Sequence, residues 1–286
     1  MTYSAVSRAV LACTLLFSNA AWSQDQKDAQ EDPATAEIRK LPWQVGPAKG
    51  TVGSKATIDV PADAGILDEA AGERFLKLTG NLPSPGNTVM ANGDWWATFS
   101  FSDVGFVKDD EKLDPDALLA SIKETDEPGN EQRRKLGFQQ LHTDGWVVPP
   151  HYDAESKHLE WGIRLRVEGS DEPVVNYTVR LLGRTGYESV VLVTSPATLS
   201  KDVAELRTVL KTFDFNAGEK YSEFRPGDHV AEIGLGALVV GGAAAAVVKT
   251  GFWKVILAFL AASWKLVVAA VVALFAGIGK LVKRKA

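Results

Sequence analysis

Four side chains that can transfer a proton or ligate a metal lie in one short segment: His151, Asp153, His158 and Glu160. The residues between them, 152–157, have the pattern of a β-hairpin turn, which would bring the two imidazoles together. A metal site needs three or four such ligands to converge, and no His-Glu-x-x-His or comparable spacing is present. If Leu159 and Trp161 point into a core, His158 and Glu160 share the outer face of a half-exposed strand. We therefore interpret the four residues as a polar surface hairpin that binds a ligand or partner without a metal.

A second polar set is suited to binding an anion: Asn130, Arg133, Arg134, Arg180 and Arg184. Their donors would converge if the helix end that carries the first three met the strand pair that carries the last two. Arginines more often cover a sheet edge or pair with acids, and this chain has acids in excess. We keep Arg180 and Arg184 as candidate binding residues beside the hairpin.

Acidic side chains also gather in the segment Lys108-Asp109-Asp110-Glu111. The Asp-x-Asp-x-Asp-Gly order of a calcium loop is absent, so we interpret this segment as a solvated turn that starts the next helix. The nucleophile and phosphate motifs Gly-x-Ser-x-Gly, Ser-x-x-Lys and the Walker loop are missing too. The sequence thus predicts no catalytic residue, no metal and no cofactor, and catalysis is not expected.

Aromatic side chains are concentrated in residues 95–107. Alternation places Trp95, Phe99 and Phe101 on one face of a strand, where we expect them to form part of a core. Trp96 points to the other face and would offer a platform for a carbohydrate or peptide only if it is exposed.

The elements that must position these residues alternate between residues 41 and 226. Alternating apolar residues predict strands at 56–60, 145–148, 159–167, 174–182, 188–194 and 212–215. Helical spacing and capping residues predict helices at 66–78, 116–122, 131–136 and 199–211, with a break at Pro128-Gly129. Consecutive strands joined by short links imply an antiparallel sheet that helices cover. The predicted fold class is therefore α+β, a single antiparallel-sheet α/β sandwich, whose last strand, helix and strand resemble the end of a PsbP/Mog1-type sandwich.

Both ends of the chain carry targeting patterns. Residues 1–23 have one positive charge, an apolar run and small residues before a cleavage point, as in a secretory signal peptide. Residues 24–40 are polar without an apolar period, which predicts a disordered tether. Residues 227–286 are predicted to anchor the chain in a membrane through the apolar stretches 231–253 and 255–279. Either both stretches cross as a helical hairpin, or one crosses and a lysine-striped helix lies in the interface.

The charge distribution and the cysteine count restrict the partners. The net charge is -5, but residues 231–286 are basic and the body before them is strongly acidic. An acidic body repels a phosphate backbone, so nucleic acid is not an expected partner. The one cysteine, Cys13, falls within the predicted signal peptide, so we expect no disulfides.

Several ordered motifs resemble an uncharacterised bacterial family of predicted membrane-anchored proteins, the domain of unknown function 2167. The resemblance covers the chain from about residue 41 to the tail. The motifs are Gly105-Phe106-Val107-Lys108-Asp109-Asp110, Gly129-Asn130-Glu131-x-Arg133, Gly145-Trp146, Pro150-x-Tyr152-Asp153, His158-Leu159-Glu160-Trp161, Asn176-Tyr177-x-x-Arg180-x-Leu182-Gly183-Arg184 and Asp228-x-Val230-Ala231. The family supplies no activity, cofactor or catalytic residue, and the resemblance implies an envelope protein with a C-terminal membrane segment.

These observations predict a non-catalytic scaffold or binding protein of the bacterial cell envelope. Its domain would lie in the periplasm, held at the inner membrane by the C-terminal anchor, and an envelope protein would be its partner. One alternative is a metal-dependent or acid–base envelope hydrolase that uses the hairpin at 151–160. A second alternative is an accessory subunit of a membrane transporter, with Lys265 facing a helix of another protein.

Overall fold

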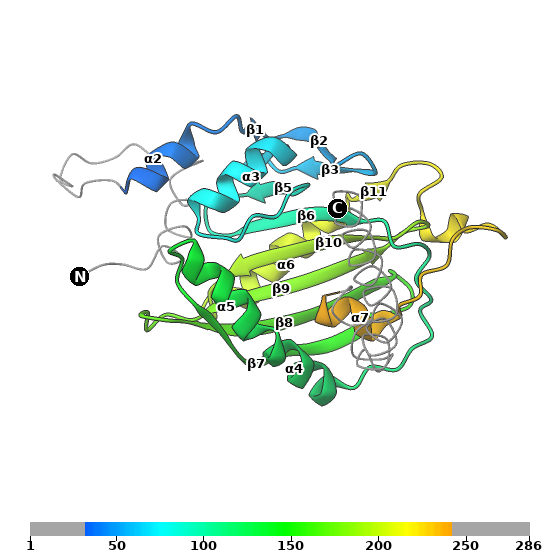
Figure 1. Ribbon diagram of the computed structural model, residues 1–286. Coiled ribbons are helices and arrows are strands. Elements are labelled where there is room, and N and C mark those ends of the chain that lie inside the picture. The colour runs from blue at the N-terminus through cyan, green and yellow to red at the C-terminus, as the bar shows by residue number, and fades with distance from the viewer. Residues whose placement is uncertain (1–31, 242–286) are drawn as a thin grey trace, which may run out of the picture. The chain divides into compact units, whose positions relative to one another are not determined.

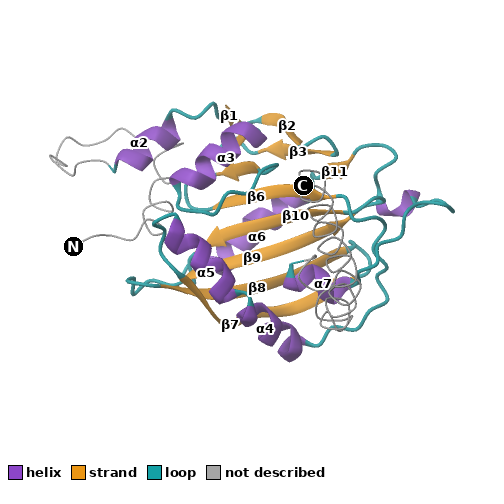
Figure 2. Cartoon of the chain, in the orientation of Figure 1, coloured by secondary structure: helices purple, strands orange, loops and turns teal. Residues whose placement is uncertain are grey.

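The computed structural model describes residues 32–241, which hold two antiparallel sheets. The large sheet has eight strands in the order β1 (Gln44–Val45), β4 (Gly65–Leu67), β5 (Thr88–Ala91), β6 (Trp96–Ser102), β10 (Tyr187–Thr194), β9 (Val174–Leu182), β8 (His158–Val167) and β7 (Leu141–Asp153). The small sheet has three strands in the order β11 (Asp214–Phe215), β3 (Ala56–Val60) and β2 (Ala48–Val52). The helices are α2 (Pro33–Arg39), α3 (Glu69–Leu78), α4 (Pro115–Glu124), α5 (Asp126–Lys135), α6 (Leu199–Leu210) and α7 (Leu235–Val240), and Tyr221–Glu223 form a 3₁₀ turn. The fold class is therefore α+β (Figures 1 and 2).

The middle strands of the large sheet are apolar on both faces. On β10, Val190 and Leu192 point to one side, Tyr187 and Val193 point to the other, and all four side chains are buried. Because successive residues of a strand alternate between faces, a sheet of such strands must be covered on both sides. Each fully buried Leu or Val side chain contributes about 1.5–3 kcal/mol, so a bare face in the middle of the sheet would be costly.

Two sets of elements supply this cover. α6 and the small sheet pack on one face, called the α6 face below, where Leu206 and Ile58 are fully buried. α3, α4, α5 and α7 lie over the opposite face, called the α3 face (Figure 1). On the α3 face, Phe75 and Trp96 form an edge-to-face pair with ring centroids 5.3 Å apart, and Leu238 of α7 is fully buried. Both faces of the large sheet are therefore covered, and this sheet is the middle layer of the fold.

Many elements predicted from the sequence are confirmed. The strands predicted at 56–60 and 174–182 have the bounds of β3 and β9. Asp114 caps α4, the helix predicted at 116–122, since its Oδ1 accepts a hydrogen bond from the Ala117 amide at 3.2 Å and Pro115 follows at the first helical position. The helix predicted at 66–78 begins only at Glu69, because the residues before it form β4 between β1 and β5.

The predicted break at Pro128-Gly129 was wrong. α5 runs through both residues, and the interruption falls earlier, at Thr125, between α4 and α5. The Thr125 hydroxyl donates to the Ile122 carbonyl at 2.7 Å and so terminates α4. Pro128 lies in the first turn of α5, where a missing N–H breaks no intrahelical hydrogen bond. Proline therefore marks the start of this helix rather than an interruption.

The structure also moves both predicted limits of the domain. The predicted tether at 24–40 includes α2, whose Ile38 is 2% exposed and whose Ile38 carbonyl accepts a hydrogen bond from Trp43 Nε1 at 2.9 Å. At the other end, α7 packs against α4 and the sheet, although we assigned residues 227–286 to the anchor. The domain thus extends beyond 41–226 on both sides. The predicted signal peptide and the remainder of the predicted anchor lie outside the described residues.

No helix within residues 32–241 has the length and apolarity needed to span a membrane. The predicted crossings at 231–253 and 255–279 therefore stay predictions, because only the first ten residues of the former, 231–240, fall inside described elements and loops of the domain.

Glu188 allows a test of the buried sheet. Its side chain is 1% exposed, and neither carboxylate oxygen has a hydrogen-bond partner. Burial, with a smaller contribution from Glu69, raises the pKa of Glu188 to about 8. In the folded protein Glu188 therefore keeps its proton up to about pH 8, whereas in the unfolded chain it releases the proton near its ordinary pKa of about 4.5. Because of this difference, Glu188 destabilises the folded state increasingly as pH rises from about 4.5 to 8.

We expect Glu188→Gln to stabilise the full chain at pH 8 by about 1–3 kcal/mol and to have little effect at pH 5. Thermal unfolding of both proteins across this pH range measures the difference. Glu73→Gln, at an exposed position of α3, serves as the control and should leave the stability unchanged at both pH values. A Glu188→Gln effect independent of pH would show that Glu188 is not protonated in the folded state.

Candidate functional site

The predicted hairpin forms, and its four polar residues share one face. β7 and β8 pair so that His151 lies opposite Glu160 and Asp153 lies opposite His158. Opposed residues of antiparallel strands point to the same side of a sheet, so all four belong to the α6 face. The sequence prediction that His158 and Glu160 share a face, with Leu159 and Trp161 in the core, is confirmed by the burial of both apolar residues.

Glu160 is the centre of this cluster. Its Oε2 accepts hydrogen bonds from the Tyr177 hydroxyl and from Arg207 Nη2, the latter at 2.6 Å. His151 Nε2 lies 3.9 Å from Oε2, and His158 Nδ1 lies 3.9 Å from Oε1. The two imidazoles therefore flank one carboxylate without forming close hydrogen bonds to it. β7 supplies His151, β8 supplies His158 and Glu160, β9 supplies Tyr177 and α6 supplies Arg207, so the cluster joins four elements.

The electrostatics fix Glu160 as an anion at neutral pH. Burial raises the pKa of Glu160, but hydrogen bonds from Tyr177 and Arg207 outweigh that effect and hold the pKa below its ordinary value. Burial lowers the pKa of His158, so its imidazole is neutral near pH 7. A carboxylate already engaged by a phenol and a guanidinium is a poor general base. The arrangement is that of a fixed polar surface.

Asp153 belongs to the hairpin turn rather than to the Glu160 cluster. Its Oδ1 accepts a hydrogen bond from the Glu155 amide at 2.9 Å, and its Oδ2 accepts one from the Ser156 hydroxyl at 2.8 Å. Both oxygens therefore support the turn. Within residues 32–241, no three His, Cys, Asp or Glu side chains are grouped in a way that could hold a metal ion.

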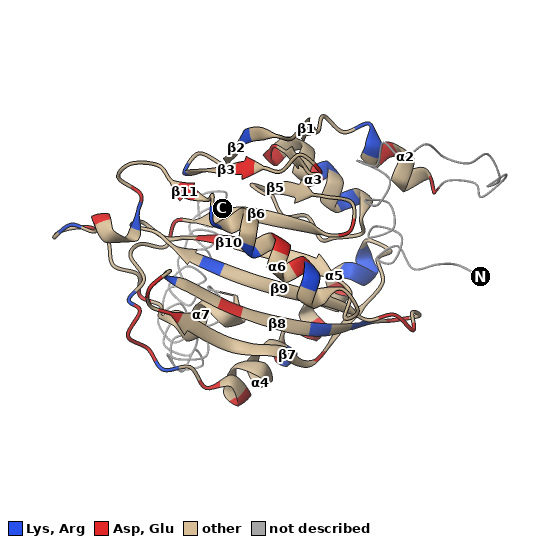
Figure 3. Ribbon diagram, turned by 180° about the vertical axis from the view of Figure 1, so that it is seen from behind, with Lys and Arg blue, Asp and Glu red and all other residues tan. Residues whose placement is uncertain are grey.

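Within residues 32–241, no helix covers the sheet next to this cluster on the α6 face. Figure 3 shows α6 crossing β9 and β10, while β7 and β8 have no helix in front of them. Arg164 and Arg166 on β8 are more than a third exposed, and both approach Asp144, at 3.7 and 3.6 Å. Val147 is 36% exposed on the same hairpin. We call this area the hairpin surface and define it by His151, His158, Arg164, Arg166 and Val147.

The predicted arginine cluster does not form. Arg184 makes a two-pronged ion pair with Asp228, at 2.7 and 2.6 Å. Asn130 uses its side-chain amide to bond both the N–H and the C=O of Leu141, which fastens α5 to the start of β7. Arg134 pairs with Glu127 on its own helix. These residues lie in different parts of the fold and make structural contacts, so they do not converge on one shared site. A binding role of Arg184 stays a prediction.

Arg180, the other predicted binding arginine, holds α7 in place. Its guanidinium lies over the rings of Trp161 and Tyr187, at 5.2 and 5.3 Å from their centroids. It donates to the Ser189 hydroxyl and, at 3.4 Å, to the Leu238 carbonyl of α7. At the other end of α7, Glu111 accepts a hydrogen bond from the Gly236 amide at 3.2 Å. An acid at the first turn and a cation at the last complement the helix dipole.

The acidic segment at 108–111 is not a simple solvated turn. Asp109 Oδ2 accepts hydrogen bonds from the Tyr152 hydroxyl and from Lys157 Nζ, both at 2.8 Å, and so ties the segment to the hairpin. Glu111 binds α7 instead.

Trp96 does not offer an aromatic platform on the surface. The sequence analysis made such a platform conditional on the exposure of Trp96, and its side chain is only 3% exposed.

The sequence analysis missed Tyr177 and Arg207 as members of the cluster. Tyr177 lies in a motif that carries the family resemblance, but its contact with Glu160 depends on strand register. Arg207 sits among other charged residues of α6, and no local pattern distinguishes it. Alternation along β9 alone could have placed Tyr177 on one face, whereas only the packing of α6 brings Arg207 to Glu160.

The described residues define an α+β sandwich protein built on an antiparallel sheet. The chain belongs to the family described as "Protein of unknown function (DUF2167)", whose model matches residues 44–274, and this confirms the resemblance seen in the motifs. Among solved structures, the chain is similar to the solution structure of cyanobacterial PsbP (CyanoP) from Synechocystis sp. PCC 6803. That match has 13% identity and a TM-score of 0.35, and it covers 56% of this chain and 86% of the other. No curated protein matches the chain.

Glu160→Gln tests the cluster. We expect it to destabilise the protein by about 1–2 kcal/mol at pH 7, mainly because the buried Tyr177 hydroxyl loses a charged acceptor; Arg207 is half exposed and its share is screened. Because the pKa of Glu160 is lowered on folding, the loss should shrink as pH falls below about 4.5. Thermal unfolding at pH 7 and pH 4 measures both effects. Glu168→Gln, on an exposed residue, is the control, and an equal loss in both variants would contradict the assignment.

Proposed function

We propose that the chain is a non-catalytic binding protein of the bacterial cell envelope, and that a protein partner docks on the hairpin surface. The observation that carries this proposal is that no helix of the described part of the chain covers β7 and β8 on the α6 face, in a sheet whose middle strands are covered on both sides. The polar groups at this gap are held in a fixed arrangement by Glu160, Tyr177 and Arg207. A fixed, exposed and polar sheet face suits recognition better than proton transfer.

The charges of the hairpin surface favour an acidic partner. Arg164 and Arg166 share the single carboxylate of Asp144, at distances longer than a normal hydrogen bond. One acid cannot neutralise two guanidinium groups, so positive charge is in excess there. The exposed Val147 adds an apolar contact beside them. The proposed partner segment therefore carries Asp or Glu side chains next to an apolar residue, and opposite charges would speed its encounter.

The membrane part of the proposal rests on the sequence. We propose that the C-terminal segment anchors the chain in the inner membrane and that the domain lies in the periplasm. With α7 docked on the domain, the first apolar stretch is reduced to residues 241–253, about 20 Å long as a helix and too short for a crossing of about 30 Å. The stretch 255–279 is long enough. A single crossing there would leave Lys280, Lys283, Arg284 and Lys285 on the cytoplasmic side, in agreement with the positive-inside tendency.

Attachment to the membrane gives this binding role its mechanism. A domain held near the bilayer meets partners in the same membrane at a high effective concentration, so a modest surface is sufficient for stable association. The hairpin surface would then act as the recognition element and the C-terminal segment as the tether.

Cross-linking from the hairpin surface tests the proposal. A photoreactive amino acid in place of Val147, in the full chain and in its native membrane, should cross-link to one envelope protein in near-stoichiometric yield. Reversing both charges, with Arg164→Glu and Arg166→Glu, should reduce that yield at least tenfold, because the acidic partner is repelled. Both side chains are about half exposed, so thermal unfolding should be unaffected.

The matched control is the double variant Lys77→Glu and Lys123→Glu, which makes the same charge change at exposed positions of α3 and α4, on the other side of the sheet. It should leave the cross-link intact. Equal losses in the two variants, or cross-linking to lipid alone, would refute docking on the hairpin surface. Turnover of a substrate that Glu160→Gln abolishes would favour the hydrolase alternative.

A further inference from the structure

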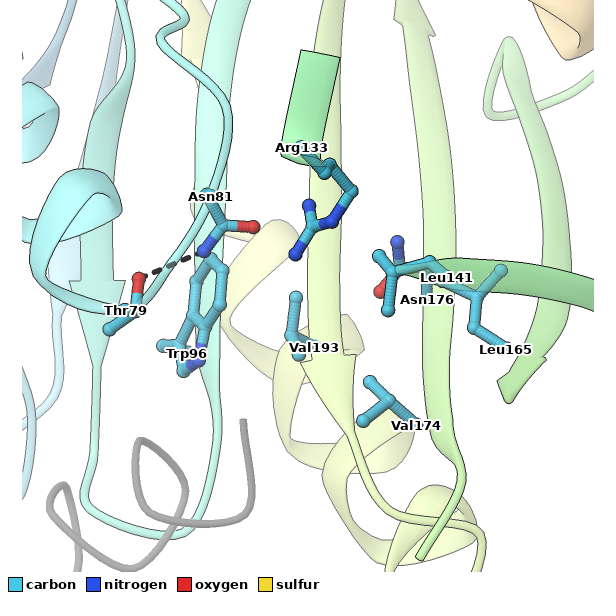
Figure 4. Close-up of a pocket in the computed structure, with 9 residues that line it drawn as sticks. All are labelled: Thr79, Asn81, Trp96, Arg133, Leu141, Leu165, Val174, Asn176 and Val193. Atoms are coloured by element: carbon cyan, nitrogen blue, oxygen red, sulfur yellow. Dashed lines mark hydrogen bonds between the residues drawn. The ribbon is translucent and has the colours of Figure 1, made fainter. Parts of the chain in front are cut away.

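A hollow opens on the α3 face, between the end of α3, α5 and the sheet (Figure 4). It contains about 420 Å³ of space, including the part open to solvent. Its lining residues come from seven segments of the chain: Thr79, Asn81, Trp96, Arg133, Leu141, Leu165, Val174, Asn176 and Val193. Apolar side chains of the strands line much of it, and the polar side chains come from α5, from the segment after α3 and from β9.

Arg133 brings an uncompensated positive charge to this hollow. Its side chain is 7% exposed, and its guanidinium donates to two neutral carbonyls, those of Gln139 and, at 3.0 Å, Gly80. Its neighbours in α5 differ, since Arg134 pairs with Glu127 and Lys135 with Glu131. No described carboxylate forms an ion pair with Arg133. Burial lowers the pKa of Arg133, with no opposing contribution from a nearby acid.

Two further donors in the hollow lack acceptors. Trp96 Nε1 is buried and has no hydrogen-bond partner. The Asn176 side chain makes no hydrogen bond within residues 32–241. Figure 4 shows the Arg133 guanidinium directed into the hollow, with Asn81 on one side and Asn176 on the other. A buried donor without an acceptor is uncommon in folded proteins, and Trp96 Nε1 lines the same hollow as the Arg133 charge, which no described acid pairs, and the half-buried Asn176 amide. This combination indicates an anionic ligand.

We propose that the hollow binds the carboxylate of a small acid with an apolar body. Arg133 supplies the opposite charge, while Asn176 and Trp96 supply neutral donors. Val174, Val193 and Leu165 contact the apolar body, as expected for a site that combines an apolar wall with a few polar groups. The carboxylate could belong to a short acyl chain or to the C-terminus of a peptide, since both present the same chemistry. The site lies on the opposite face from the hairpin surface and does not depend on the proposed partner binding.

The indole N–H signal of Trp96 reports on the site directly. The full chain, labelled with ¹⁵N at its tryptophans and reconstituted in lipid nanodiscs, is titrated with hexanoate and with its neutral analogue hexanamide. A second pair, acetyl-Val-Leu and its C-terminal amide, represents a peptide terminus. Trp96→Phe assigns the signal. We expect a saturable shift with at least one acid and an affinity at least tenfold weaker for its amide.

Asn176→Asp is the variant that tests the charge. It places a carboxylate beside Arg133 and removes no hydrogen bond of the fold, whereas replacing Arg133 would also break its contacts with Gly80 and Gln139. We expect at least tenfold weaker binding of the acid, and unchanged binding in the control Arg134→Gln.

The outcomes separate the possibilities. Tighter binding of hexanoate identifies the acyl source, and tighter binding of acetyl-Val-Leu identifies the peptide source. Equal shifts by acid and amide, no shift by either acid, or unchanged binding in Asn176→Asp would each overturn the proposal. Failure here leaves the cross-linking result from the hairpin surface unaffected, because the two sites share no residue.

Discussion

The fold depends on one constraint, which is that the central strands of the large sheet are apolar on both faces and must be shielded from water on both. α6 and the small sheet meet this need on one side, and four helices meet it on the other. Within the described part of the chain, neither layer extends over the whole sheet, and the places where this cover is incomplete are open polar areas. The hairpin surface is one such area and the hollow beside Arg133 is another. Both candidate sites thus follow from how the sheet is covered.

The same constraint explains the use of charged residues that had been expected to bind ligands. Arg180 stacks on Trp161 and holds the end of α7 over the sheet, while Glu111 holds its beginning. Asn130 fastens α5 to β7, and Arg184 fixes the segment around Asp228. Such contacts position the covering elements, and most of them involve residues of the motifs that carry the family resemblance. Much of that resemblance therefore reflects the architecture of the domain.

The periodicity of apolar residues was sufficient to predict the long strands and helices, but it did not indicate the short ones. β9 could be predicted because polar residues alternate along it with apolar residues that favour strands. The shared face of His158 and Glu160 followed from the same alternation of side chains between the two faces of a strand. β5 is buried at all four positions and shows no alternation, so no pattern indicated it. α7 has the composition of a membrane segment, and only its packing against Arg180 and α4 shows that it belongs to the domain. Arg207 and Arg133 gain their roles from tertiary contacts that local sequence does not encode.

The central claim is that the hairpin surface is covered by a partner in the native membrane, and the histidines report on it. Of the four histidines in the chain, His151 lies on this surface with half of its side chain exposed, and exposed His229 lies elsewhere. The full chain is carbethoxylated with diethyl pyrocarbonate in its native membrane and again after purification. We predict that labelling of His151 is several-fold slower in the membrane while that of His229 is unchanged. Equal labelling of His151 in both states, or a parallel decrease at His229, would contradict the claim.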